Sequence, residues 1–214
     1  MLVHLNAQTS KYHNDMLDEF YRIRKSIFID RLNWDLPAQG DKEIDQYDHN
    51  QCNYLLSISN DKVSGGIRLT PSLAPNLTFD TFSDVFNLPT HIKPQNNLLE
   101  ISRLGIIKTS DEMPSNIVRR KTLELFQGIL KFGLCYGYEK IITVTDIRIE
   151  RIFKLSDWPL ERISEVQQVG NTRALVGFLH ITQEYYDKIQ AKLDQLSPAL
   201  DKQNLSVSGK RGNF

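Results

Sequence analysis

Hydrophobic and polar positions along this chain follow two different periods, and the changes between them predict its elements. A period of two is typical of strands, and a period near 3.6 residues is typical of amphipathic helices. Strands are therefore expected at residues 2–6, 53–59, 62–70, 98–107, 141–145, 163–169 and 172–181. Longer helices are expected at residues 14–29, 115–132 and 182–196, and shorter ones near residues 79–86 and 147–155.

Turn and cap signals separate these elements. Asn60 and Asp61 tolerate the positive dihedral angles of a tight hairpin, and Asp146 and Thr182 can cap the helices that follow them. Residues 31–50 are rich in Asp, Asn, Gly and Pro, which predicts a long loop without regular structure. The order helix, hairpin, strand, helix, strand, helix, hairpin predicts an α/β (α+β) fold with a mixed sheet and helices on both faces.

Length and composition are those of one domain. The chain has 214 residues, 40% of them hydrophobic, so residues 1–196 are expected to form a single domain, followed by a polar tail at 197–214. Lysine plus arginine equal aspartate plus glutamate at 26 each, which gives no overall attraction to nucleic acid. The two cysteines predict neither a disulfide framework nor a metal site, and no stretch is long enough for a membrane span. A cytoplasmic location is expected.

Several charged residues occupy unusual positions. Arg68, Glu100 and Arg103 fall within apolar strand segments, where a charge is costly unless it is paired. They indicate either a structural salt-bridge network or an active site. The loop after the first helix, which is either a solvated acidic loop or part of a site, gathers Trp34, Asp41, Glu43, Asp45, Tyr47 and Asp48. On that helix Arg24 and Phe28 lie one turn apart, so the arginine either extends to solvent or points with the ring into a site.

Four sequence blocks bring these features together. They are YRIRKSIFIDRLNWD, EIDQYD, GGIRLTPSLAP and LLEISRLGI, and in order and spacing they resemble the signature blocks of the LuxI-type acyl-homoserine lactone synthases, or autoinducer synthases. The resemblance is strong over the first half of the chain and holds in outline beyond it, through IITVTDIRIERIF and WPLERIS.

The resemblance implies a fold and a reaction. The expected fold is a twisted mixed sheet similar to that of GCN5-related acetyltransferases. The expected enzyme makes a quorum-sensing signal: it acylates the amine of S-adenosylmethionine from an acyl-carrier-protein thioester, then closes a lactone and releases 5′-methylthioadenosine. S-Adenosylmethionine is a substrate in this scheme, so neither a cofactor nor a metal is expected.

The recurring polar and aromatic residues of the family all match in type. They are Arg24, Phe28, Trp34, Asp45, Asp48, Arg68, Glu100 and Arg103. The resemblance implies that the first six bind S-adenosylmethionine: the rings face its adenine and sulfonium, the aspartates hold its cationic groups, and an arginine binds its carboxylate or steadies the acids.

Glu100 is the expected base that removes the proton from the amine, directly or through water. Arg103, the other expected catalytic residue, lies three positions along the same strand, so simple alternation places it on the opposite side. A bulge could turn it back, or it could orient the loop acids.

The acyl donor has its own set of expected contacts. Thr143, Phe126 and Ser102 are expected beside the acyl chain. The segment after residue 107 lacks the glycine-rich turn that binds the pyrophosphate of coenzyme A, which favours an acyl carrier protein. A basic face is expected to dock this acidic partner, formed by Arg119, Arg120, Lys121, Lys131, Arg148, Arg151 and Lys154.

Two other functions remain open from the sequence. One is an acetyl-coenzyme A-dependent N-acetyltransferase of similar fold that acts on a different amine. The other is a sensor that binds adenosyl ligands without catalysis.

Overall fold

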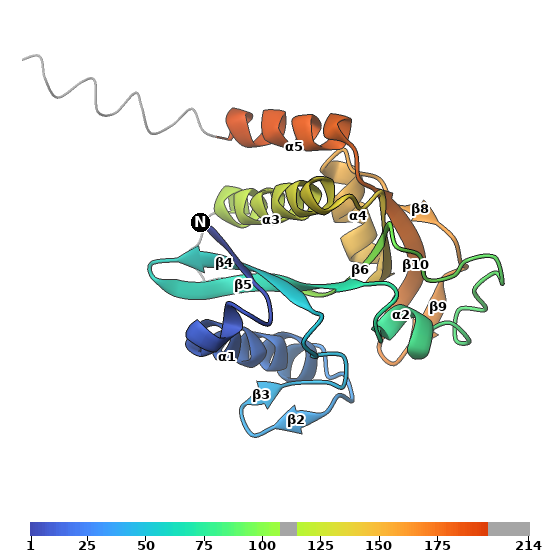
Figure 1. Ribbon diagram of the computed structural model, residues 1–214, viewed down its shortest axis with the longest axis horizontal. Helices are drawn as coiled ribbons and strands as arrows, with labels where there is room; N and C mark the ends of the chain where they lie inside the picture. Colours follow the sequence, from blue (N-terminus) through green and yellow to red (C-terminus); the bar gives the residue numbers. More distant parts are fainter. Residues whose placement is uncertain (108–114, 197–214) are drawn as a thin grey trace, which may run out of the picture.

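A mixed sheet of eight strands forms the centre of the protein, and helices cover both of its faces (Figure 1). The computed structural model describes residues 1–107 and 115–196, so the predicted tail at 197–214 lies outside the described residues. The strand order is β1-β4-β5-β6-β7-β10-β8, and β9 also pairs with β10. β6 and β7 are parallel, whereas the other paired strands of this sheet are antiparallel. The predicted fold class is confirmed.

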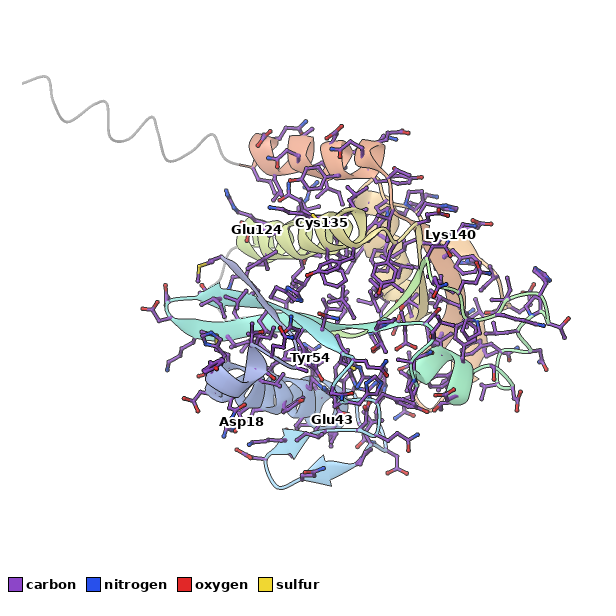
Figure 2. The ribbon with its side chains drawn as sticks, in the orientation of Figure 1. Asp18, Glu43, Tyr54, Glu124, Cys135 and Lys140 are labelled. Atoms are coloured by element: carbon purple, nitrogen blue, oxygen red, sulfur yellow. The ribbon has the colours of Figure 1, made fainter. Side chains whose placement is uncertain are left out.

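The strands of the sheet are β1 (Leu2–Leu5), β4 (Asn53–Ser59), β5 (Lys62–Pro71), β6 (Leu98–Ile106), β7 (Lys140–Asp146), β8 (Glu161–Arg162), β9 (Gln167–Val169) and β10 (Thr172–His180). The helices are α1 (Asn14–Arg24), α2 (Leu77–Asp80), α3 (Ser115–Tyr136), α4 (Ile147–Leu155) and α5 (Gln183–Gln195), with a 3-10 turn η1 (Ser10–Tyr12) before α1. Figure 2 shows Asp18 of α1 on one side of the sheet and Glu124 of α3 on the other. Within the described residues, no helix combines the length and the apolar run that a membrane crossing requires.

The turn and cap predictions are confirmed. Asn60 and Asp61, with φ of 50° and 58°, connect β4 and β5 in a tight hairpin. Asp146 accepts a hydrogen bond from the Arg148 N–H at the start of α4, and Thr182 accepts one from the Tyr185 N–H at the start of α5.

Two predictions in the first part of the chain are wrong in detail. The helix expected at 14–29 changes after Arg24 into a π-helical segment η2 (Lys25–Arg31), in which the Leu32 N–H reaches back to the Ile27 carbonyl. The loop expected at 31–50 contains a small hairpin of β2 (Ala38–Gln39) and β3 (Lys42–Glu43). Strands of two residues are too short to show an alternating pattern, so the sequence did not reveal them.

Two later predictions are also corrected. The short helix expected near 79–86 begins earlier, as α2, because Asn76 caps it by accepting a hydrogen bond from the Phe79 N–H. The strand expected at 163–169 is shortened to β9 at its end, and a separate short strand, β8, precedes the expected range; the two pair with different parts of β10.

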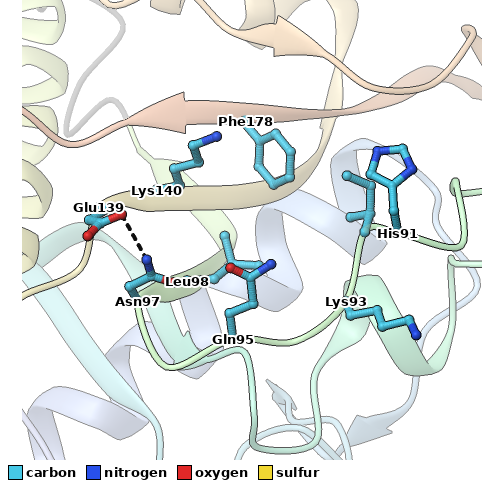
Figure 3. Close-up of a pocket in the computed structure, with 9 residues that line it drawn as sticks. His91, Lys93, Gln95, Asn97, Leu98, Glu139, Lys140 and Phe178 are labelled. Carbon is cyan, nitrogen blue, oxygen red and sulfur yellow. Dashed lines mark hydrogen bonds between the residues drawn. The ribbon is translucent and has the colours of Figure 1, made fainter.

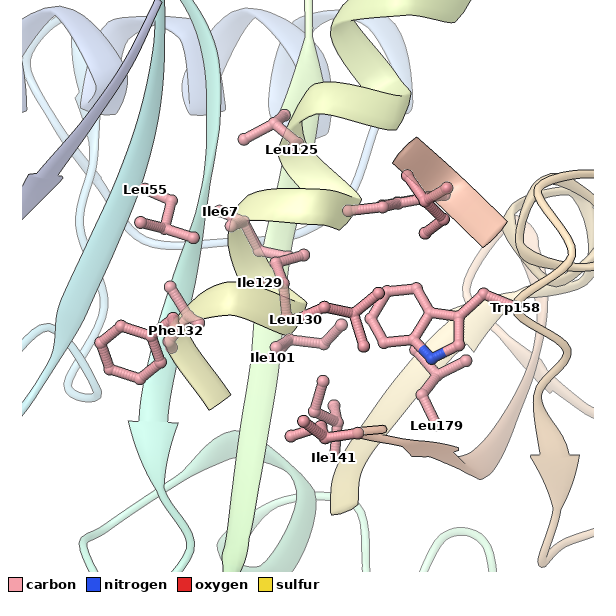
Figure 4. Packing of buried hydrophobic residues seen from close by; sticks show 14 of the residues in the cluster. Leu55, Ile67, Ile101, Leu125, Ile129, Leu130, Phe132, Ile141, Trp158 and Leu179 are labelled. Carbon is pink, nitrogen blue, oxygen red and sulfur yellow. The ribbon is translucent and has the colours of Figure 1, made fainter. Parts of the chain in front are cut away.

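Strand alternation separates the apolar core into clusters on the two faces of the sheet. Leu99 and Ile101 of β6 pack with Ile129 of α3 and Trp158 in the largest cluster (Figure 4). On the opposite face, Leu98 belongs to a cluster with Ile142, Phe86 and Phe178. A third cluster, also on this second face, joins α1 to β4 through Phe20, Ile23, Tyr54 and Leu56.

Glycines allow the first helical segment to approach the sheet closely. Gly66 of β5 lies opposite Gly105 of β6. A Cβ atom at Gly66 would lie 2.9 Å from the Phe20 ring, and one at Gly105 would lie 2.6 Å from Ile27. The missing side chains therefore bring α1 and η2, with Arg24 and Phe28, directly over β5 and β6.

Candidate active site

Three arginines and three acids form one buried group between α1 and the sheet. Its members, called the arginine–acid cluster below, are Arg24, Arg68, Arg103, Glu43, Asp45 and Asp48. Their side chains come from α1, β3, β5, β6 and the loop after β3, and each is at most 7% exposed. Residues far apart in sequence therefore converge, as the sequence predicted.

Arg24 holds two of the acids in place. Its Nη1 and Nη2 atoms donate to the two carboxylate oxygens of Asp48, at 2.7 and 2.8 Å, and its Nε donates to Glu43 at 2.5 Å. The side chain is completely buried, so it does not extend to solvent. Of the two alternatives for this side chain, the structure shows the one in which it points inward, where it binds Glu43 and Asp48.

Asp45 joins the other two arginines. Arg68 donates to both of its carboxylate oxygens, at 2.5 and 3.2 Å, and Arg103 donates to one of them at 2.7 Å. Arg103 also donates to Glu43 at 3.0 Å. The cluster therefore pairs three positive groups with three negative ones, and its acids bind the protein's own arginines.

A β-bulge explains how Arg103 reaches this cluster. The register between β5 and β6 shifts between Gly66 and Arg68, and Arg103 has a φ of 58°. Ser102 and Arg103 consequently face the same side of the sheet, where Arg68 donates to Ser102 at 3.0 Å. Beyond the bulge Leu104 packs against the cluster of α3. Simple alternation was thus wrong here, and the bulge that the sequence left open is present.

Two aromatic residues, Phe28 and Trp34, extend from the arginine–acid cluster toward β10. The Arg103 guanidinium lies 5.6 Å from the centre of the Phe28 ring, and the Phe28 and Trp34 rings are 5.1 Å apart. The Trp34 indole N–H donates to Thr172 at 2.9 Å. Phe28, which is buried, and Trp34, which is partly exposed, therefore form an aromatic wall beside the charged groups.

Glu100 lies on the same face of β6, two residues before Ser102. It is completely buried. One carboxylate oxygen accepts a hydrogen bond of 2.6 Å from the Thr78 N–H, and the other has no partner among the described residues. Burial raises the pKa of Glu100 above its ordinary value, although the Thr78 N–H and the charge of Arg68 oppose this effect.

The pKa values of two acids of the cluster, Glu43 and Asp48, shift in the opposite direction. Burial alone would raise the pKa of Asp48, but the hydrogen bonds and charge of Arg24 lower it below its ordinary value. For Glu43 the effect of burial is likewise exceeded by Arg24 and Arg103, and its pKa is lowered. Two kinds of carboxyl group therefore lie close together: paired acids that stay ionised and one acid, Glu100, whose charge is disfavoured.

Three residues of this region were missed as site residues from the sequence. Glu43 was noticed only as one acid of a loop, although its carboxylate binds two arginines. Tyr54 of β4 donates to Asp48 at 2.8 Å, and Figure 2 labels both Glu43 and Tyr54 on the α1 side of the sheet. The Thr78 N–H that binds Glu100 is a backbone group, so residue type could not have revealed it.

The residues expected beside the acyl chain lie on different faces of the sheet. Thr143 of β7 donates to the Ile101 carbonyl at 3.0 Å. Phe126 of α3 is buried and stacks on Phe153 of α4 at 4.8 Å. Both belong to the α3 face, whereas Ser102 lies on the α1 face with Arg68.

The expected basic face needs one correction. Lys121 is only 7% exposed, because its helix position turns it inward, and its Nζ has no hydrogen-bond partner among the described residues. It therefore does not belong to a docking surface. The other expected members are at least partly exposed, although Arg120 and Arg148 pair with Glu124 and Asp146.

A surface cavity of about 270 Å³ lies at the start of β6 and β7 (Figure 3). Its lining includes His91, Lys93, Lys140 and Phe178, and none of the expected site residues. Within the described chain, no three or more His, Cys, Asp or Glu side chains are grouped as metal ligands.

The parallel strands β6 and β7 pair only from Leu98 to Glu100 with Lys140 to Ile142, and the charged and aromatic groups lie on one face of the sheet. This arrangement agrees with the GCN5-related acyltransferase fold that the sequence resemblance implies. A comparison with protein families agrees, because residues 7–189 match the autoinducer synthase family model. The chain belongs to this family and is an acyl-homoserine lactone synthase.

Individual relatives are consistent with this assignment. The chain is 32% identical over 180 residues to an acyl-homoserine-lactone synthase of Agrobacterium fabrum, covering 83% of this chain and 84% of that protein. Among solved structures, it is similar to BjaI, described as a coenzyme A-dependent acyl-homoserine lactone synthase and solved with MTA, at a TM-score of 0.79 and 19% identity, covering 91% of this chain and 89% of that one. The acyl-homoserine lactone synthase LasI gives a TM-score of 0.78 at 19% identity, covering 89% of this chain and 94% of that one.

Proposed function

We propose that this synthase transfers an acyl group from an acyl-carrier-protein thioester to the amine of S-adenosylmethionine, with Glu100 as the base. The observation that carries the proposal is the hydrogen bonding of the buried Glu100 carboxylate. One oxygen of this carboxylate is anchored by the Thr78 N–H, and the other has no hydrogen-bond partner in the described part of the chain, beside the arginine–acid cluster. An anchored carboxylate of raised pKa is suited to accept a proton at neutral pH.

The substrate amino acid is assigned to the α1 face. Phe28 and Trp34 offer aromatic surfaces for the adenine and the sulfonium, and Arg103 lies against the Phe28 ring. Asp45, Asp48 and Arg24 bind one another, so they act mainly by holding Arg68 and Arg103 in position. The structures of BjaI with MTA and with S-adenosylmethionine support a site for an adenosyl substrate in this fold.

The reaction then proceeds in two steps. Glu100 removes a proton from the ammonium group, directly or through water, and the free amine attacks the thioester carbonyl. The thiol leaves, and an amide bond has replaced the thioester bond. The substrate carboxylate next attacks its own γ-carbon, expelling methylthioadenosine and closing the lactone, a step favoured by enforced proximity.

The acyl donor is assigned to the gap in pairing between β6 and β7. These strands pair only from Leu98 to Glu100 with Lys140 to Ile142, although both continue further. Beyond Glu100 the backbone of β6 does not pair with the backbone of β7, although the Ile101 carbonyl accepts a hydrogen bond from the Thr143 side chain. The other β6 backbone groups on this side can bind the amides of a pantetheine arm. Thr143 and Phe126 lie on the α3 face of this region, so the acyl chain would extend to that face.

We propose that the acyl group is delivered by an acyl carrier protein and not by coenzyme A. Arg151 and Lys154 are exposed on α4, and Lys131 is exposed on α3, which packs against α4 through Phe126 and Phe153. Exposed basic residues on adjacent helices attract an acidic carrier protein. BjaI is described as coenzyme A-dependent, so the choice of donor has to be measured for each synthase.

The test uses purified protein with S-adenosylmethionine and a hexanoyl donor, followed by mass spectrometry of the products. Wild-type protein is expected to form the lactone and methylthioadenosine, with a higher kcat/KM for hexanoyl-carrier protein than for hexanoyl-coenzyme A. A higher value for coenzyme A would refute the proposed donor but not the reaction. Lack of lactone with either donor would refute the reaction itself.

Glu100→Gln tests the base. The amide keeps the size of the side chain and an acceptor for the Thr78 N–H, but it cannot accept a proton. A fall in kcat of about 10²–10⁴-fold is expected for loss of a general base. Far-ultraviolet circular dichroism should match the wild type, and unchanged kcat would exclude Glu100 from this role.

A further inference from the structure

Thr172 binds the edge of the aromatic wall from a distant part of the chain. It is the first residue of β10 and is 5% exposed. Its Oγ1 accepts the hydrogen bond of 2.9 Å from the indole N–H of Trp34, across 138 residues of sequence. Neither the catalytic scheme nor the arginine–acid cluster involves this residue.

The backbone before Trp34 explains why the indole needs such an anchor. Asn33 adopts a φ of 53°, which ends the π-helical segment and turns the chain back toward Phe28. The Trp34 N–H then binds the Phe28 carbonyl at 2.9 Å, and the two rings pack at 5.1 Å with a tilt of 30°. These contacts fix the backbone and one surface of the ring, but the indole edge is fixed by Thr172.

The hydrogen bond also joins two separate parts of the fold. Trp34 packs with the cluster of α1 and β4, whereas Thr172 pairs with Val169 at the end of the sheet that holds β9 and β10. Burying an indole N–H without a hydrogen-bond partner is costly. The ring orientation in which the Trp34 N–H donates to Thr172 is therefore preferred. The plane of Trp34 is thus set by a residue of β10.

We infer that Thr172 is a positioning residue for the substrate amino acid, because its hydroxyl holds the Trp34 ring in the orientation that receives the adenosyl group of S-adenosylmethionine. The inference rests on the proposed function. Thr172 itself contacts Trp34 and takes no part in proton transfer. Its effect should therefore appear in the binding of adenosyl compounds and not in the use of the acyl donor.

Two substitutions separate the hydroxyl from the shape of the side chain. Thr172→Val removes the acceptor and keeps a β-branched residue suited to a strand. Thr172→Ser keeps the acceptor and removes only a methyl group. The valine variant is expected to raise the KM for S-adenosylmethionine about three- to tenfold, the factor that corresponds to one lost hydrogen bond. Its KM for the acyl donor should be unchanged, and the serine variant should resemble the wild type.

Tryptophan fluorescence provides a second measurement that does not require turnover. The chain has two tryptophans, and Trp158 is completely buried, so acrylamide quenching reports mainly on Trp34. Thr172→Val should increase the quenching and weaken the binding of 5′-methylthioadenosine, with both properties retained in Thr172→Ser. A valine variant with wild-type KM for S-adenosylmethionine and wild-type quenching would overturn the inference, as would a serine variant impaired as strongly as the valine variant.

The two possible failures are distinguishable. If wild-type protein forms no lactone, the proposed function fails, and the affinity for 5′-methylthioadenosine still decides whether Thr172 positions an adenosyl site. If wild-type protein forms the lactone and the affinity and KM are insensitive to Thr172→Val, the inference alone fails.

Discussion

At the scale of single residues, burial distinguishes arginines that look alike in the sequence. Arg22 and Arg24 lie on the same helix, but Arg22 forms an exposed ion pair with Asp41 while Arg24 is enclosed by acids. A buried charge that loses its partner has no water to replace it, so removing one member of a buried pair is far more costly than removing an exposed one. The two residues thus provide a matched comparison within a single turn of α1.

Arg24→Met is expected to destabilise the protein by about 3–5 kcal/mol, because it leaves Glu43 and Asp48 buried without their main partner. Arg22→Met should leave the urea midpoint close to that of the wild type. Equilibrium unfolding followed by circular dichroism measures both. Equal midpoints for the two variants would show that the cluster does not contribute to stability through Arg24.

Much of the site could be predicted from residue types, but their contacts could not. Arg24, Phe28, Trp34 and the acids of the loop were identified from blocks of sequence, and they do converge. The sequence could not show that the aspartates bind arginines of the same chain, because burial and pairing depend on the packing of α1 over β5. Lys121 illustrates the reverse case: it looked like a surface residue and is buried.

At the scale of elements, long periodic segments were predicted well and local irregularities were not. β5, β6, β7 and α3 appear close to their expected positions, because many residues contribute to each pattern. The π-helical segment, the two-residue strands and the bulge at Arg103 are short departures from a regular period. These irregularities are what place Phe28 and Arg103 in the site, so the function depends on the features that periodicity describes least.

The bulge gives a prediction about the backbone at Arg103. A φ of 58° is costly for residues with a Cβ atom and not for glycine. Arg103→Gly should therefore be more stable than Arg103→Ala by about 1 kcal/mol, the reverse of the usual order within a strand. Both variants lose the contacts with Glu43 and Asp45, so the comparison isolates the backbone. Greater stability of the alanine variant would contradict the bulged conformation.

At the scale of the whole molecule, the sheet separates the residues proposed to bind the two substrates. The charged and aromatic residues lie on the α1 face, whereas Thr143 and Phe126 lie on the α3 face. The proposed route of the donor passes between β6 and β7, next to Glu100, where the two faces meet. Glu100, the proposed base, is therefore buried within the sheet, and that burial affects the stability of the entire fold.

The stability of the folded protein therefore depends on pH. Glu100 influences it in one direction, and Glu43 and Asp48 influence it in the other. The lowered pKa values of Glu43 and Asp48 contribute stability above about pH 4, and this contribution is lost as the pH falls through their values in the folded state. The raised pKa of Glu100 acts in the other direction: its contribution is present below about pH 4 and is lost as the pH rises through the value in the folded state.

Glu100→Gln removes only the second effect, since Glu43 and Asp48 remain. The free energy of unfolding of this variant, relative to the wild type, is therefore expected to increase as the pH rises from about 4 toward 7, by at most about 1.4 kcal/mol per pH unit. Urea unfolding at several pH values measures this difference, and any constant effect of the amide cancels from its slope. A difference that stays constant or decreases over this range would show that the folded protein does not disfavour the charge of Glu100, and the argument for Glu100 as a base of raised pKa would be lost with it.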